Sequence, residues 1–479
     1  MKTYERSKLK RVLSRADVLA LSFGTMIGWG WIMLPGQWIH EAGLGGAVVS
    51  FLIGGFMFAL VGLTYAELTP ALPIAGGEMA FAYRGLGQFW AWVGGWSISF
   101  AYIGVASWEA IAISTACDYL FHIPKIGYLW TVSGYDVYLS WAAVGITGGI
   151  ILTALNIIGV KPAAIFQIMG SLGLVITGIL FIFGGAAFGS TENIGPLFTG
   201  FGGLVSVLII TPSMYLGFDV ISQSTEEMNI PLPDIAKVLM FSIFLAAAWY
   251  ILIIIGTAIA APAIIRDNAL VPVADMASYA FQVPIFGKIM IMGGVCGILT
   301  SWNGYIVGAS RIIFAMGNAK MLPRSFSTIH PKYQTPVTAL AIVGFICCLS
   351  PLLGKNANLW FINSAAVGTV INYLLVSISF IIIRKREPFL ARPFEVKRWK
   401  LVGAGAVASS LFFLYLFTPF SGNPIVWTKE WILIIVWALL GIVLALVSTK
   451  TYSGISRQER EILLFGTEYS REEVDIKSK

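Results

Sequence analysis

The chain alternates long, nearly uncharged apolar stretches with short polar segments. A helix that crosses the roughly 30 Å hydrocarbon core of a bilayer needs about 20 apolar residues, and the stretches have that length. The pattern therefore predicts an all-α membrane protein with twelve transmembrane helices. They are expected at about residues 17–38, 44–66, 86–117, 137–158, 162–187, 201–222, 238–263, 283–311, 336–353, 357–383, 401–420 and 431–449.

Composition agrees with this pattern and narrows the function. Hydrophobic residues make up 57% of the chain and charged residues only 11%, which excludes a string of soluble domains. The four cysteines lie in apolar stretches without a CxxC spacing, and the three histidines are scattered. Neither pattern is typical of a disulfide framework, a metal centre or a haem site. We expect no cofactor and no enzyme activity, because the sequence shows no clustered nucleophile, metal set or acid pair.

The net charge of +7 is an orientation signal and does not indicate a nucleic-acid partner. If the amino terminus lies inside, 26 of the 31 Lys and Arg residues fall on the inner side. This bias predicts that both termini, residues 1–16 and 450–479, are cytoplasmic segments of a protein in a plasma or bacterial inner membrane. The first apolar stretch has no small-residue cleavage pattern, so we expect it to be retained and not removed as a signal peptide.

Two of the predicted helices contain residues that interrupt a helix near the middle of the membrane. The first has three glycines between Gly24 and Gly30, each of which costs a helix about 1 kcal/mol relative to alanine. The sixth contains Pro212, which removes a backbone hydrogen bond, followed by Gly217 and Asp219. The two interruptions lie five helices apart, as expected for inverted five-helix repeats, and they indicate a substrate site at the bilayer midplane.

A break in a membrane helix frees backbone amides and carbonyls that lipid cannot satisfy. The amino ends of half-helices suit a carboxylate, and exposed carbonyls suit an ammonium group or a metal cation. A zwitterion therefore matches such a site. The alternative is that the glycines only allow close helix packing and that Pro212 is an ordinary kink.

Four ordered motifs resemble those of the amino acid, polyamine and organocation permeases. They are Gly24 to Gly30; Tyr65-Ala66-Glu67-Leu68 with Pro73 to Glu78; Tyr215 to Asp219 with Glu226-Glu227; and Arg311 to Met316 with Leu322-Pro323. The resemblance covers essentially the whole chain. It implies a leucine-transporter-like fold that works by alternating access, with inverted repeats at residues 17–187 and 193–385 and two peripheral helices at 401–449.

The breaks and the resemblance together give a predicted substrate site. It comprises Thr25, Met26, Ile27, Gly28, Trp29, Gly30, Tyr102, Ser213, Met214, Tyr215, Gly217, Phe218 and Asn303. Trp29 stands where relatives usually carry a serine or threonine, and Ser213 stands where they often carry an aromatic gate. We expect Trp29 to gate the site or stack on the ligand, and Ser213 to offer the hydroxyl. The alternative is that Trp29 faces lipid or packs against a neighbouring helix.

The resemblance also implies a candidate sodium site. Thr300 and Ser301 lie where sodium-coupled members of the fold supply adjacent hydroxyls, and hard cations favour oxygen ligands. The lysine that occupies this cation position in some relatives is absent here, because the corresponding position is close to Leu174. The alternative is that the two hydroxyls bond back to their own helix.

Acids inside a membrane cost about 2.5–3.5 kcal/mol at mid-depth on insertion scales, and they usually mark function or pairing. Glu109 falls late in the third helix, so we expect it to line the outer vestibule and attract a cationic or zwitterionic solute. The alternative is that it pairs with Lys288 or lies at the level of the lipid headgroups. By resemblance, Asp219 holds the unwound segment in shape; a proton-carrying role is the alternative. The glutamates after the sixth helix are expected to pair with Lys161 or Arg311 as an inner gate. The predicted gating residues are Trp29, Glu109, Asp219, Glu226, Glu227 and Arg311.

The sequence therefore predicts a secondary active transporter for a small amino acid or a related amine, with sodium as the candidate coupling ion. The main alternative is a proton-coupled or exchange-type permease, of the ethanolamine kind, whose ligand has no carboxylate. A facilitative channel is a weaker alternative. The expected partners are a small-molecule substrate and the lipid bilayer; no feature indicates an oligomeric state or a partner subunit.

Overall fold

The computed structural model describes residues 9–421 and 429–467, and its regular structure is almost entirely helical. The long helices are α3 (Pro35–Ala71), α5 (Gln88–Phe121), α6 (Leu139–Ile158), α7 (Val160–Phe188), α11 (Leu232–Ala260), α14 (Ile285–Asn318), α16 (Asn358–Arg386), α17 (Trp399–Leu416) and α18 (Lys429–Thr451). The shorter ones are α1 (Arg15–Met26), α2 (Gly30–Met33), α4 (Gly77–Leu86), α8 (Phe201–Leu208), α9 (Thr211–Tyr215), α10 (Val220–Gln223), α12 (Ala263–Asp267), α13 (Pro272–Ala280), α15 (Val337–Leu349) and α19 (Arg457–Phe465).

The prediction of a multi-pass helical membrane protein is confirmed. Within the residues that the structure describes, ten segments are long and apolar enough to cross a bilayer. The first predicted helix is not among them because it is interrupted between α1 and α2. The ninth, which ends in the 3₁₀ turn η4 (Ser350–Leu353), is shorter than the others. The arrangement of twelve helices as two inverted repeats stays a prediction.

The predicted boundary between the first two helices is a single residue inside α3. Gly43 has φ 74° and ψ 167°, a conformation that side chains with a Cβ rarely adopt. A Cβ at this position would also come within 2.6 Å of the Leu197 carbonyl oxygen. The Gly46 amide donates a hydrogen bond of 3.0 Å to that carbonyl. The chain therefore turns from one span to the next while the backbone of the loop before α8 replaces the missing helical partners.

The all-α class is confirmed, and one loop adds a short hairpin: β1 (Tyr128–Val132) and β2 (Tyr135–Tyr138) pair antiparallel between α5 and α6. The two turn residues, Ser133 and Gly134, have φ of 51° and 78°, as a type I′ turn requires. The flanking residues are mainly aromatic and β-branched, which favours strands. A search for long apolar stretches does not detect strands of five and four residues.

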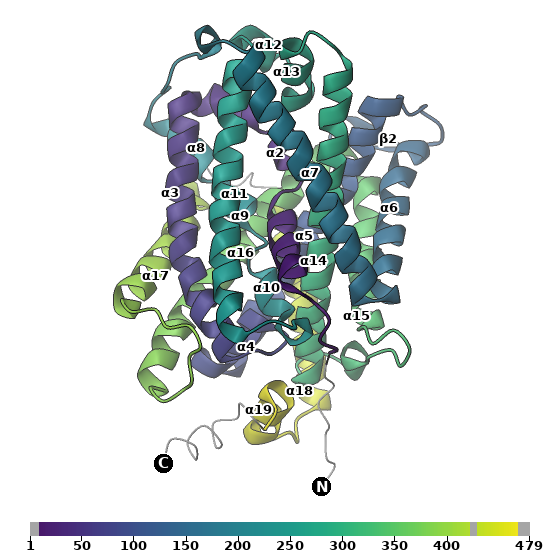
Figure 1. Cartoon of the computed structure of the whole chain (residues 1–479). Coiled ribbons are helices and arrows are strands. Elements are labelled where there is room, and N and C mark those ends of the chain that lie inside the picture. The colour runs from purple at the N-terminus through teal and green to yellow at the C-terminus, as the bar shows by residue number, and fades with distance from the viewer. Residues whose placement is uncertain (1–8, 422–428, 468–479) are drawn as a thin grey trace.

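The broken first helix runs through the middle of the bundle. α1 contacts α7, α11 and α14, while α5 packs on α14 and α16 and α3 packs on α11 (Figure 1). Each helix satisfies its own backbone groups by internal hydrogen bonds, as a bilayer demands, and the neighbouring helices enclose the broken one. The break after α1 is therefore lined by protein.

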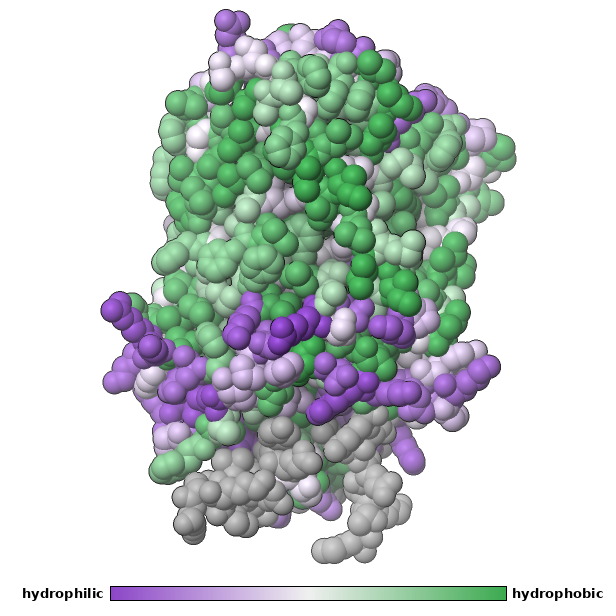
Figure 2. All heavy atoms as spheres, viewed as in Figure 1, coloured by the Kyte–Doolittle hydropathy of each residue, from purple (hydrophilic) through white to green (hydrophobic). Residues whose placement is uncertain are grey.

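Figure 2 shows a broad band of apolar side chains over the body and a belt of hydrophilic side chains below it. This distribution matches a hydrocarbon core bordered by a polar interface. α19 lies at the polar end, where Arg84 of α4 pairs with Glu461 at 3.1 Å and with Glu387 at 2.8 Å (Figure 1). We call this the α19 end, and the opposite end, where α12 and α13 lie, the α13 end.

Candidate functional site

The first membrane helix is unwound, as the sequence predicts. α1 ends at Met26, Ile27 leaves the helical region with φ −106° and ψ 79°, and the helix resumes at Gly30. Gly24 stays helical, and a Cβ there would come within 2.6 Å of the Ser171 hydroxyl oxygen of α7. The glycine motif therefore serves both purposes that the sequence allows: Gly24 permits close packing, and the later residues form the break.

The second break lies between α9 and α10. Leu216 is extended, and Gly217 has φ +128°. Pro212 occupies the first turn of α9, where a missing amide costs little, so it does not kink a helix. Asp219 Oδ1 accepts a hydrogen bond of 2.9 Å from the Gly217 amide. This contact agrees with the expectation that Asp219 holds the unwound segment in shape.

The two breaks lie directly against each other. A Cβ on Gly217 would come within 2.9 Å of the Met26 amide nitrogen, and one on Gly30 within 3.0 Å of the Met214 sulfur. The predicted site residues from two distant parts of the chain therefore meet at the centre of the molecule, where glycine is needed for the backbones to approach.

Two tyrosines that the sequence analysis did not select satisfy carbonyls freed by the breaks. Tyr250 of α11 donates a hydrogen bond of 2.9 Å to the Met26 carbonyl, and Tyr305 of α14 donates one of 2.8 Å to the Leu216 carbonyl. A tyrosine inside an apolar helix needs a partner for its hydroxyl, and this was the available signal. These bonds leave fewer backbone groups for a ligand than the sequence argument assumed.

Glu109 lies at the first break, which corrects its predicted position in the outer vestibule. Its side chain is 1% exposed, and Oε1 accepts a hydrogen bond of 3.4 Å from the Trp29 amide. Gly28 makes room for the carboxylate, since a Cβ there would collide with it and would also crowd the Ser301 hydroxyl. The predicted span 86–117 is close to α5, so the helix bounds were nearly right; the error lay in converting distance along the helix into depth in the fold.

The Trp29 ring packs against Gly294 of α14 and is buried. In this structure, therefore, the alternative of contact with a neighbouring helix applies, and the ring does not face the cavity as the ligand-stacking prediction requires. Ser213, by contrast, lines a cavity, and its hydroxyl donates a hydrogen bond of 3.3 Å to the Ile362 carbonyl of α16.

That cavity lies toward the α13 end and has a volume of about 380 Å³. Its walls include Leu34 after α2, Ser213 in α9 and Trp108 in α5, so it reaches both broken helices. Glu41 and Asn363 add polar groups to its lining.

The side chains of four other predicted substrate residues form hydrogen bonds to other parts of the protein or pack against them. The Thr25 hydroxyl donates to a carbonyl one turn earlier in α1, and Tyr215 donates a hydrogen bond of 2.9 Å to the Phe51 carbonyl of α3. Tyr102 packs against α14, and Phe218 packs against aromatic rings of α3 and α16. These residues build the walls around the breaks.

The hydroxyls of the candidate sodium site lie next to the first break. Thr300 donates to the Cys296 carbonyl at 2.9 Å, which is the back-bonding that the sequence analysis kept as an alternative. The oxygen lone pairs of Thr300 stay available to a cation. The Ile27 carbonyl lies close to Gly297, one turn before Ser301. Oxygen ligands of the predicted types thus surround the break; the sodium site itself stays a prediction.

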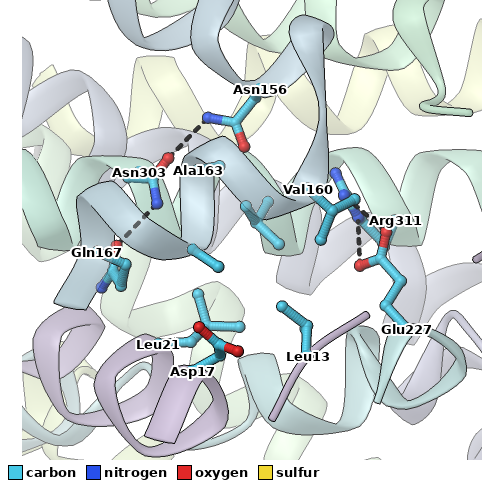
Figure 3. A pocket seen from close by; sticks show the side chains of 12 residues that line it. Leu13, Asp17, Leu21, Asn156, Val160, Ala163, Gln167, Glu227, Asn303 and Arg311 are labelled. Carbon is cyan, nitrogen blue, oxygen red and sulfur yellow. Dashed lines mark hydrogen bonds and ion pairs between the residues drawn. The ribbon is translucent and has the colours of Figure 1, made fainter. Parts of the chain in front are cut away.

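Asn303 does not point at a ligand amine. It accepts a hydrogen bond of 2.7 Å from Asn156 of α6 and donates one of 2.8 Å to Gln167 of α7 (Figure 3). Gln167 in turn donates to the Ala20 carbonyl of α1 at 3.1 Å. This amide chain, which sequence reasoning missed, links α1 to three neighbouring helices. The cavity beside it measures about 20 Å³, room for about one water molecule.

The α19 end is closed by a buried ion pair. Glu227 and Arg311 lie 2.9 Å apart with side chains 0% and 1% exposed, which is one of the predicted inner-gate pairings (Figure 3). Lys161 pairs instead with Asp17, at 3.6 Å. Glu226 accepts a hydrogen bond of 3.5 Å from a backbone amide before α1. The ion pair therefore closes the route from the α19 end to the breaks, whereas the cavity lined by Ser213 reaches the broken helices from the α13 end.

These features define a multi-pass helical membrane protein with two touching helix breaks beneath a cavity that is open on one side. The family model for amino acid permeases matches residues 13–440, and the chain belongs to that family. Its resemblance to the amino acid, polyamine and organocation permeases is thus confirmed. Members of the family are transporters, so the chain is not an enzyme.

Named relatives cover most of the chain at modest identity. The branched-chain amino acid permease BcaP of Bacillus subtilis is 26% identical over 478 residues, covering 95% of this chain and 96% of the relative. The methylthioribose transporter of Bacillus subtilis is 25% identical over 470 residues, covering 94% and 95%. The mouse cationic amino acid transporter 4 is 26% identical over 407 residues, covering 81% of this chain and 63% of the relative.

Proposed function

We propose that this protein is a secondary active transporter that carries a small solute with an ammonium group, an amino acid or a related amine, by alternating access. One observation carries the proposal: Glu109 places a buried carboxylate at the first helix break, and its Oε2 has no hydrogen-bond partner. A buried carboxylate without a counter-charge is costly, and a ligand ammonium group supplies one.

The sealed α19 end and the open cavity at the α13 end support alternating access. A carrier exposes its site to one side at a time through rocking of helices around a fixed centre. The two touching breaks form such a centre, and the ion pair at the α19 end is a closure that can open. The proposed architecture has twelve helices, with inverted repeats at residues 17–187 and 193–385, and the α19 end facing the cytoplasm of a plasma or bacterial inner membrane.

The relatives are named for branched-chain amino acids, methylthioribose and cationic amino acids, which favours an amino acid as the solute. A second candidate is an amine without a carboxylate. It is favoured by the contact between Glu109 and the Trp29 amide, because the protein's own carboxylate then holds the amide that a ligand carboxylate would use.

Counterflow tests the carrier mechanism. Proteoliposomes preloaded with an unlabelled solute are diluted into the same labelled solute, using leucine, arginine, methylthioribose and ethanolamine in turn. A carrier accelerates entry of the label by exchange, so we expect preloading with at least one of these solutes to stimulate its uptake. Uptake that preloading never stimulates would indicate a channel.

Sodium is a proposed coupling ion whose site is tested by removing a hydroxyl. Ligand binding raises thermal stability with occupancy, so sodium should raise the melting temperature further in the presence of a bound solute. Ser301→Ala and Thr300→Ala should each abolish that additional rise. Ser410→Ala is the matched control, because that buried hydroxyl also bonds back to its own helix, at 2.9 Å, but lies in α17. Sodium dependence that persists in both variants would place the cation elsewhere.

A further inference from the structure

A pair of buried carboxyl groups lies on the α19 side of the breaks. Glu78 is in the first turn of α4, and Asp219 precedes α10; both side chains are 0% exposed. Gly77 lets the two helices touch, since a Cβ there would collide with Ser222 of α10. Figure 1 shows α4 and α10 near each other toward the α19 end of the bundle.

The pair has no compensating charge. No hydrogen bond of good geometry reaches either carboxyl oxygen of Glu78 or Oδ2 of Asp219, although hydroxyl groups lie beside both acids. Among residues 9–421 and 429–467, no lysine, arginine or histidine forms an ion pair with either acid. Glu109 belongs to the first break, and Glu227 belongs to the closure at the α19 end. Asp219 uses only Oδ1 to hold the second break, which leaves its Oδ2 and the Glu78 carboxyl group.

Tyrosines from α3, α5, α14 and α16 complete the cluster around the pair. Tyr65 of α3, Tyr102 of α5 and Tyr373 of α16 interact electrostatically with both acids, and Tyr305 of α14 interacts with Asp219. The hydroxyls of Tyr102 and Tyr373 lie beside Asp219, and that of Tyr65 lies beside Glu78. The cluster therefore has donors for one ionised carboxylate.

Two like charges in a dry site are far more costly than one, and a shared proton removes one of them. Burial, together with the negative charge of Asp219, raises the pKa of Glu78. A metal cation is a poorer occupant, because the described residues contain no group of three or more acidic, His or Cys side chains that could hold one. A single proton is the smallest cation that satisfies the cluster.

The pair is mechanically connected to the site. Asp219 Oδ1 holds the Gly217 amide, and Gly217 lies against the backbone of Met26 in the first break. A change in the charge of the pair therefore acts on the contact between the two broken helices, through one shared carboxylate. Glu78 approaches from α4, outside the membrane-spanning segments.

We propose that Glu78 and Asp219 form a proton-binding site that takes up one proton and releases it to the opposite side in each transport cycle. In each cycle one carboxylate accepts a proton from a hydronium ion on one side of the membrane. The O–H bond formed in this way then breaks, and the proton passes to water on the other side. No electrons are transferred. The inference rests on the proposed transport function and adds a coupling ion to it.

The test uses proteoliposomes without sodium, with a pH-sensitive dye trapped inside and acid imposed outside. Each of leucine, arginine, methylthioribose and ethanolamine that undergoes counterflow is offered as the probe. The wild-type protein should accumulate the probe and bring protons in with it. Glu78→Gln should lose accumulation driven by the pH gradient, while exchange of the probe persists. Glu78→Asp, which keeps a carboxyl group, should retain part of the accumulation.

Glu192→Gln is the control, because Glu192 is exposed at the α13 side of the fold and outside the cluster. Equal pH-driven accumulation by Glu78→Gln and wild type would overturn the proposal. If Glu78→Gln does not fold, the wild-type dye measurement decides alone: probe uptake without proton entry overturns the proposal. If no probe undergoes counterflow in wild type, the transport function fails, and this inference fails with it.

Discussion

Glu109→Gln is expected to abolish transport of an ammonium-bearing solute and to weaken its binding by about 30-fold or more, since truncating one partner of a buried charge pair costs 2–5 kcal/mol or more. Glutamine keeps an oxygen that accepts the hydrogen bond from the Trp29 amide, so the first break should keep its shape. The loss then reports the missing charge. Binding is measured by thermal shift and by a labelled-ligand assay at several solute concentrations.

Glu41→Gln is the matched control, because Glu41 also lines the route to the site but is partly exposed in the wall of the outer cavity. It should leave binding within about threefold of wild type, as partly solvated charges contribute about 1 kcal/mol or less. Unchanged binding in Glu109→Gln would remove the basis of the proposed ligand class. If an amino acid and its decarboxylated amine bind the wild-type protein equally, the ligand carboxylate is not recognised.

The two helix breaks could be predicted because their cause is local. Gly28, Gly30, Gly217 and Asp219 act through backbone freedom and backbone hydrogen bonding within a few residues of themselves. The motif does not say which glycine opens the helix. Gly24 stays helical because α7 packs against it, and that contact comes from a distant part of the chain.

The position of Glu109 could not be predicted, because it depends on how far α5 extends past the membrane and on the direction in which its face points. The contact between Glu78 and Asp219 could not be predicted for a similar reason. Glu78 belongs to a motif in a loop helix, and Asp219 belongs to another motif at the second break. Only the fold brings them together. The tyrosines that satisfy freed carbonyls, Tyr250 and Tyr305, were visible as polar residues in apolar helices, but their partners were not.

Asn303 shows that a residue's place in the chain can leave its role open. Its place in the eighth predicted helix allowed contact with a ligand amine and, equally, a hydrogen bond to a neighbouring helix. Its amide is used by Asn156 and Gln167, however, and the resulting chain ends on a carbonyl of α1. Buried amides seek every partner they can reach, so a neighbouring helix competes with a ligand for them.

The second large effect is expected at the closure of the α19 end. Arg311→Ala leaves Glu227 buried and unpaired, which costs the closed state about 3–5 kcal/mol. When that end opens, water solvates the glutamate and most of the cost disappears. The variant should therefore shift the equilibrium toward the open form by about 100-fold or more, since 1.4 kcal/mol corresponds to a factor of ten. The protein should remain folded but lose uptake against a gradient.

The shift is measured by thiol accessibility at the small cavity beside the ion pair. Ala163 lines that cavity and is buried, so a cysteine placed there in a cysteine-free background should react slowly with a bulky maleimide in detergent. Arg311→Ala should accelerate the reaction strongly, whereas the charge-reversed pair, Glu227→Arg with Arg311→Glu, should restore slow labelling in part. Lys161→Ala is the control, because Lys161 is largely exposed in its pair with Asp17 and such pairs contribute little. Labelling that stays slow in a folded Arg311→Ala protein would show that this ion pair does not hold the α19 end shut.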